Sequence, residues 1–191
     1  MIGNKKGLEL SINFLVVLIL TIVVLGFGIF FVRKLMGGAE EIRTSLDDQT
    51  MARIEALLND GSRVAIPFVK KETSPGKPAI FGVGILNVVG DDRFRTEAKF
   101  SAAYRDDKSK ICKSGSTGGC GSDPDGWILM DKSEKLIINN ENAKYVVAIT
   151  PPGGTPKGTY IFDIKVKYWN DGLALPGWDD YSSMNKVFVK V

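Results

Sequence analysis

The sequence predicts an α+β protein in which a long N-terminal α-helix precedes an antiparallel β-sandwich. An uncharged apolar run extends from Phe14 to Val32 and is long enough for several helical turns. Apolar residues then recur at helical spacing as far as Leu58. After Ser62 they alternate with polar residues, as they do in half-buried strands. A chain of 191 residues has room for this helix and one compact domain.

The helix is expected over residues 8–60. In its first half, 14–32, the side chains are apolar on every side, and at about 1.5 Å per residue this half matches a ~30 Å hydrocarbon core. A removable secretory signal is disfavoured because Arg33 and Lys34 follow directly, where a small-x-small cleavage site would be expected. The second half, 39–58, is amphipathic and predicts packing on a sheet. We therefore expect one nearly continuous helix with a transmembrane-like first half.

Residues 62–191 are expected to form the β-sandwich. The period of two is clearest in RFRTEAKFSAAYR and GTYIFDIKVKYW. Short strands separated by turn-rich stretches, without intervening helices, predict a sandwich with Greek-key connections. The longest irregular stretch is expected at Asp106–Gly126. Further strands are expected at Arg63–Lys70, Ala79–Val89, Trp127–Met130, Leu136–Ile138, Lys144–Thr150 and Lys186–Val191.

Composition disfavours catalysis and nucleic-acid binding. The chain has no histidine, the commonest general base and metal ligand. Its 25 basic and 22 acidic residues are mixed along the chain, so no polybasic stripe indicates a nucleic-acid surface. We expect a protein that is not an enzyme and has no cofactor, no bound metal and no nucleic-acid partner.

The two cysteines of the chain lie in the stretch CKSGSTGGC. The glycine- and serine-rich segment between Cys112 and Cys120 is flexible enough to bring them together, so we expect a disulfide. A disulfide indicates an oxidising compartment and hence an extracytoplasmic β-domain. Two free thiols in a cytosolic surface loop are the alternative.

The N-terminus resembles that of archaeal type IV pilin-like proteins with a class III signal peptide. The resemblance rests on KKG, the polar-bearing LELSIN, the apolar run and its amphipathic continuation. It implies that a prepilin-type peptidase removes a leader, residues 1–7, by cutting between Gly7 and Leu8. Two positions depart from the family pattern: Leu8 stands where glutamine is usual, and Asn13 stands near the place of the usual glutamate. The β-domain resembles immunoglobulin-like surface modules.

The resemblance implies a filament subunit whose helices pack side by side in the filament core. The subunit would be inserted in the cytoplasmic membrane before assembly, and its β-domain would lie on the filament surface for adhesion or other contacts. The alternative is a single-pass anchored extracytoplasmic β-sandwich protein that does not polymerise. The residues expected to take part in subunit assembly are Glu9, Phe14, Leu18, Leu20, Phe27 and Phe31.

Overall fold

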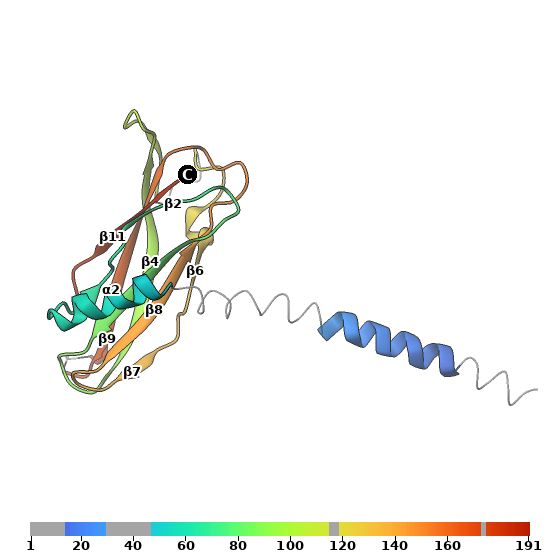
Figure 1. Cartoon of the computed structure of the whole chain (residues 1–191), viewed down its shortest axis with the longest axis horizontal. Helices are drawn as coiled ribbons and strands as arrows, with labels where there is room; N and C mark the ends of the chain where they lie inside the picture. The colour runs from blue at the N-terminus through green and yellow to red at the C-terminus, as the bar shows by residue number, and fades with distance from the viewer. Residues whose placement is uncertain (1–13, 30–46, 115–118, 173–174) are drawn as a thin grey trace, which may run out of the picture. The chain divides into compact units, whose positions relative to one another are not determined.

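The computed structural model describes residues 14–29, 47–114, 119–172 and 175–191 (Figure 1). The chain divides into two compact units, Met1–Glu41 and Ile42–Val191. The described part of the first unit is an α-helix at residues 14–29. The second unit contains the helix α2 (Asp48–Asn59), the 3₁₀ helix η1 (Pro124–Trp127) and the strands of the sandwich.

The expectation of one long N-terminal helix is wrong. Asp47 has an extended backbone, with φ −65° and ψ 153°, and its carboxylate accepts a hydrogen bond of 2.6 Å from the backbone N–H of Thr50. This is the geometry of an N-cap, so α2 is a separate helix that begins at Asp48. Helical periodicity places Asp47 on the polar side of the expected helix and does not show that this residue caps α2.

The apolar first half of the expected helix is described only in part. The described helix covers 14–29, and residues 30–32 and 39–46 of the expected helical segments lie outside the described residues. None of the helices that the structure describes combines the length and the apolar character that a membrane span requires. The fold is therefore mainly a β-sandwich accompanied by short helices.

The predicted β-sandwich is confirmed, but it is not wholly antiparallel, because the strand Lys70–Glu72 pairs in parallel with the strand Asn185–Lys190. One sheet has four strands in the order β1-β3-β8-β6. The other has seven strands, with a main path β2-β11-β9-β4-β5, while β10 pairs with β9 and β7 pairs with β4. The strand bounds are β1 (Val64–Ala65), β2 (Lys70–Glu72), β3 (Ala79–Leu86), β4 (Asp92–Tyr104), β5 (Lys110–Lys113), β6 (Ile128–Met130), β7 (Lys135–Ile137), β8 (Asn142–Ile149), β9 (Thr159–Asn170), β10 (Gly177–Asp180) and β11 (Asn185–Lys190).

The antiparallel pair β4–β9 forms the centre of the seven-stranded sheet. Its register places Phe94 opposite Tyr168 and Phe100 opposite Phe162, and it shifts once between Phe100 and Ala102. Alternate residues of both strands are buried between the sheets, which is the period-two pattern of the sequence. The other half of each strand faces outward and carries mostly charged residues.

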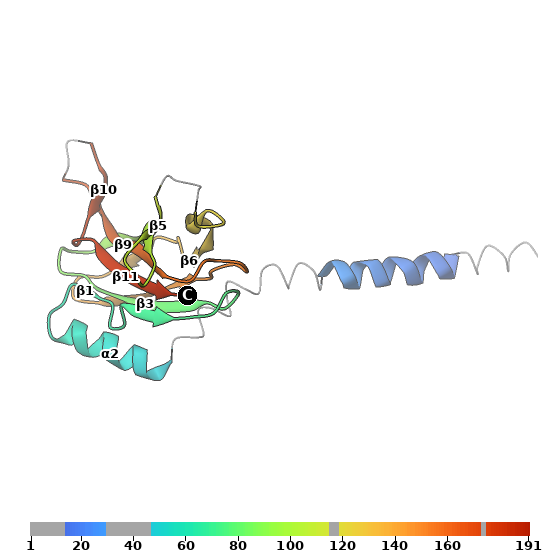
Figure 2. The ribbon, with the colours of Figure 1, turned by 90° about the horizontal axis from the view of Figure 1, so that it is seen from above.

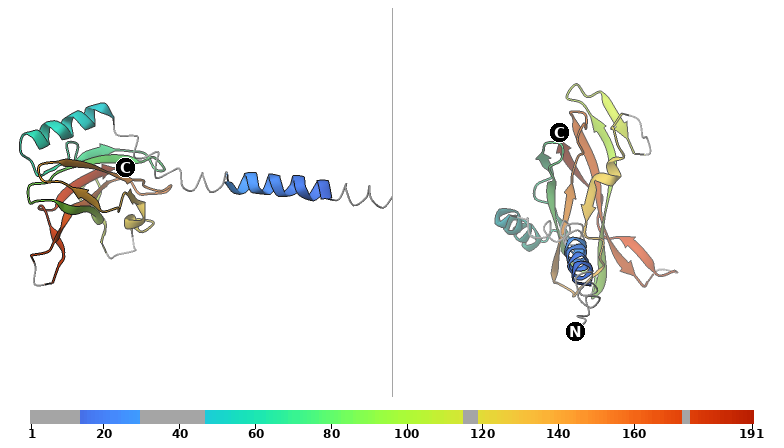
Figure 3. Two further views of the ribbon diagram at one scale, coloured as in Figure 1. Left: turned by 90° about the horizontal axis from the view of Figure 1, so that it is seen from below. Right: turned by 90° about the vertical axis from the view of Figure 1, so that its right-hand side faces the viewer.

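Helix α2 packs on the outer side of the four-stranded sheet, over β3 and β1 (Figures 2 and 3). Its buried residues are Thr50, Ile54 and Leu58, spaced four apart on one face. The helix lies directly over Gly84 of β3, where a Cβ atom would come within 2.3 Å of the Ile54 Cγ2 atom. A glycine at this position therefore allows the close approach of helix and sheet.

Candidate functional site

The helix at residues 14–29 presents apolar side chains to solvent in every direction. All of its residues are exposed, including Phe14 at 69% and Phe27 at 71%, together with Leu18 and Leu20. Its polar side chain, Thr21, donates its hydroxyl to the Val17 carbonyl at 2.7 Å and so presents no free donor. Four of the predicted assembly residues therefore lie on this helix. Glu9 and Phe31, like the expected cleavage site at Gly7 and Leu8, lie outside the described residues.

This exposure carries a large free-energy cost in water. Thirteen large apolar side chains of the helix are between 46% and 71% exposed. Burying a side chain of this kind contributes about 1.5–3 kcal/mol, so burying the exposed parts of all thirteen contributes on the order of 10–20 kcal/mol. Such a surface is stable only against another apolar surface, which makes it the strongest candidate for assembly in the described chain.

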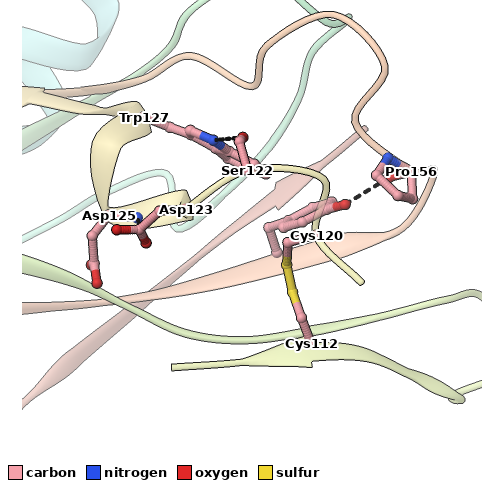
Figure 4. Close-up of a disulfide and its surroundings, with 8 residues drawn as sticks. Cys112, Cys120, Ser122, Asp123, Asp125, Trp127 and Pro156 are labelled. Carbon is pink, nitrogen blue, oxygen red and sulfur yellow. Dashed lines mark hydrogen bonds between the residues drawn. A yellow bond between two sulfur atoms is a disulfide. The ribbon is translucent and has the colours of Figure 1, made fainter. Parts of the chain in front are cut away.

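The predicted disulfide between Cys112 and Cys120 is present (Figure 4). Part of the irregular stretch expected around it is regular, since Cys112 lies in β5 and pairs with Ala103 of β4. Both cysteines are buried and belong to the main hydrophobic core. The bridge therefore fastens Cys120 to the sheet edge and the core.

The residues after Cys120 form a compact polar network (Figure 4). The Ser122 hydroxyl accepts a hydrogen bond of 2.8 Å from the indole N–H of Trp127. The Asp123 carboxylate caps η1 by accepting from the backbone N–H of Asp125 at 3.1 Å, and the Asp125 carboxylate accepts from the backbone N–H of Phe100 at 2.6 Å. The Asp125 carboxylate therefore joins the loop to β4, while that of Asp123 acts within the loop. We find no metal-binding cluster within the described residues.

A second candidate surface lies on the outer side of the seven-stranded sheet and was not predicted. We name it the basic face and define it by six cations from β4, β9 and β11: Arg93, Arg95, Lys99, Lys165, Lys167 and Lys186. Beside it the indoles of Trp169 and Trp178 meet edge to face, with ring centroids 5.6 Å apart. The sequence signal was the row of charged residues that alternates with the apolar residues of both strands, from which we predicted only half-buried strands.

The comparisons with known proteins assign no family. No protein-family model matches the chain, and no curated protein matches it. Among solved structures, the PapD-like domain 7 of human CEP192 is similar with a TM-score of 0.43 and 10% identity, covering 67% of this chain and 84% of that one.

Two pilus-related structures show weaker similarity. The Salmonella enterica SafA pilin in complex with the SafB chaperone gives a TM-score of 0.36 at 11% identity, covering 66% of this chain and 53% of that one. MyfA, the major subunit of Myf fimbriae from Yersinia enterocolitica, in complex with galactose, gives 0.33 at 11% identity, covering 66% of this chain and 95% of that one. At these scores the likenesses carry no argument about function.

Proposed function

We propose that the chain is a structural, pilin-like subunit of a cell-surface filament, with no catalytic role. In this proposal the helix at residues 14–29 packs against the same helix of neighbouring subunits, and the β-sandwich lies on the outside. The observation that carries the proposal is the exposure of thirteen large apolar side chains on one short helix. Copies of the same helix supply an equally apolar surface, and they do so at every position along a filament.

The N-terminal sequence supports a more specific form of the proposal. The basic pair and glycine before the apolar run are consistent with an archaeal class III leader that a prepilin-type peptidase cuts after Gly7. The disulfide supports an oxidising location for the β-domain. The exposed domain would then supply adhesive or other surface contacts.

Assembly can be tested with one charge in the middle of the helix. Leu20→Lys places an ammonium group where neighbouring helices would bury it, and a buried unpaired charge is strongly unfavourable. We expect filaments of the wild-type chain in electron micrographs of the producing cells and none of the variant. Leu175→Lys is the matched control, because Leu175 is 86% exposed in the β-domain. Filaments that form normally from Leu20→Lys subunits would refute the packing role of the helix.

Processing can be tested separately by mass spectrometry of the native N-terminus. We expect Leu8 as the first residue of the wild-type chain and an intact leader in Gly7→Leu, since a bulky side chain replaces the unobstructed backbone of glycine at the cut. A wild-type chain that retains residues 1–7 would remove the leader from the proposal and leave helix packing to stand on the Leu20 experiment. A Gly7→Leu chain that also begins at Leu8 would show that the cut does not depend on Gly7.

A further inference from the structure

The basic face carries more positive than negative charge, although the strands that form it also carry carboxylates. The six cations have four carboxylate partners nearby: Glu97, Glu134, Asp163 and Asp180. The surplus of two charges lies on a sheet surface whose side chains are half-exposed or exposed. No residue of the basic face belongs to the apolar helix, so a ligand bound to this face does not require filament assembly.

A hollow in this face gathers three of the lysines. Its volume is about 420 Å³, and its lining includes Lys99, Lys165 and Lys167 together with the serines Ser101 and Ser114. Glu97 and Asp163 also line it. The hollow therefore offers ammonium groups for anions, and hydroxyl and carboxylate oxygens that accept hydrogen bonds from hydroxyl groups.

The carboxylates nearby do not neutralise all of the positive charge on the lysines of the hollow. The Asp180 carboxylate is shared between Lys165 at 3.0 Å and Lys167 at 3.2 Å, and these two ammonium groups hold the pKa of Asp180 below its usual range. Asp163 is in register with Lys99 across the sheet but binds Lys186 at 2.6 Å. Lys99 is left with no ion pair among the described residues. An external anion would complete the charge balance.

The hairpin of β9 and β10 projects from the sandwich and borders the basic face on one side (Figure 2). The guanidinium of Arg93 lies 4.6 Å from the ring centroid of Trp169, and that of Arg95 lies 4.2 Å from that of Trp178. These contacts hold both arginine heads over the sheet, and the half-buried indoles supply apolar surface. Charge and aromatic surface are therefore combined beside the hollow.

We propose that the basic face binds an acidic polysaccharide, a polymer in which carboxylates alternate with many hydroxyl groups. The lysines and arginines would pair with its carboxylates, while Glu97 and the two serines would bond its hydroxyls. Duplex nucleic acid fits less well, because it carries a phosphate about every 1.7 Å and has few free hydroxyls, so it offers little to the carboxylates and serines of this face.

The test measures binding of the full chain to polygalacturonate, with neutral dextran and duplex DNA as comparison polymers. We expect saturable binding of polygalacturonate that weakens as salt is raised, because exposed charge pairs are screened. We expect no binding of dextran and weaker binding of DNA. Absence of polygalacturonate binding at low salt would overturn the proposal, and DNA binding of equal or greater affinity would overturn the choice of a polysaccharide.

Two sets of variants test the site itself. Replacing Lys99, Lys165 and Lys167 together by Gln should weaken binding at least tenfold. The matched control replaces Lys77, Lys110 and Lys157 by Gln, which removes the same charge from positions elsewhere on the domain and should change affinity less than twofold. Equal losses in the two sets would show that overall charge, not this face, attracts the polymer.

The opposite change should strengthen binding. Asp180→Asn releases Lys165 and Lys167 from their shared carboxylate and should tighten binding about threefold. Unchanged or weaker binding by this variant would contradict the charge argument. Thermal unfolding of each variant tests whether the domain is folded. Filament formation by the Lys-to-Gln variants should remain normal, so that failure of polysaccharide binding can be told apart from failure of filament assembly.

Discussion

Helix α2 can lie as close as it does to β3 only because residue 84 is glycine. In Gly84→Ala the new Cβ atom would stand 2.3 Å from the Ile54 Cγ2 atom, which is 1.1 Å short of the 3.4 Å at which ordinary contact begins (3.4 − 2.3 = 1.1). It would also stand 3.1 Å from a Leu58 methyl carbon. The helix must therefore either shift outward by about 1 Å or leave the sheet.

The two responses have different costs. A shift that keeps the helix docked strains the packing by about 1–3 kcal/mol. Undocking would expose Ile54 and Leu58, at about 1.5–3 kcal/mol each, or about 3–6 kcal/mol in total. The outward shift of the docked helix costs less than undocking. We therefore expect Gly84→Ala to lower the free energy of unfolding by about 1–3 kcal/mol with α2 still docked.

The measurement is urea unfolding of the full chain followed by tryptophan fluorescence. Gly153→Ala is the matched control, because no atom lies within 4 Å of a Cβ at that position. Ile54→Ala removes the clashing methyl group, so Gly84→Ala should cost less than about 0.5 kcal/mol when it is added to Ile54→Ala. Hydrogen exchange of the α2 amides reports whether the helix stays docked.

A Gly84→Ala chain as stable as the Gly153→Ala control would refute this reasoning. The same conclusion would hold if Gly84→Ala cost as much in the Ile54→Ala background as it does in the wild type, because the cost would then have another origin.

Two further predictions concern the core. Reducing the Cys112–Cys120 disulfide, or replacing both cysteines by Ser, should lower the free energy of unfolding by about 2.6 kcal/mol, the loop-entropy value for a nine-residue ring; equal urea midpoints with and without reductant would contradict this. Burial raises the pKa of Tyr160 to about 12 from 10.0, so its contribution to stability is complete below pH 10 and is lost as pH rises towards 12. Stability measured across this range should therefore fall, and it should fall less in Tyr160→Phe; an identical fall in the two chains would exclude this role for Tyr160.

Local sequence patterns determined the type of each major element. The apolar run from Phe14 predicts a helix that needs an apolar partner, because helical geometry turns its side chains in every direction. Alternation in β4 and β9 determines which face of each strand is buried, since successive side chains of a strand point to opposite sides. The cysteine spacing likewise predicted the disulfide, because only a short flexible ring has to close.

Tertiary structure decided where elements end and which residues meet. Asp47 caps α2 through one hydrogen bond to Thr50, a choice that helical periodicity does not show. The strand β10 falls in a stretch that the sequence marks only with turn residues, and it forms because β9 offers a free edge beyond the end of β11. The basic face depends on this register, which brings Lys99 from β4 beside Lys165 and Lys167 from β9. Residues more than sixty positions apart in the chain become neighbours only through strand pairing, and no local pattern encodes that pairing.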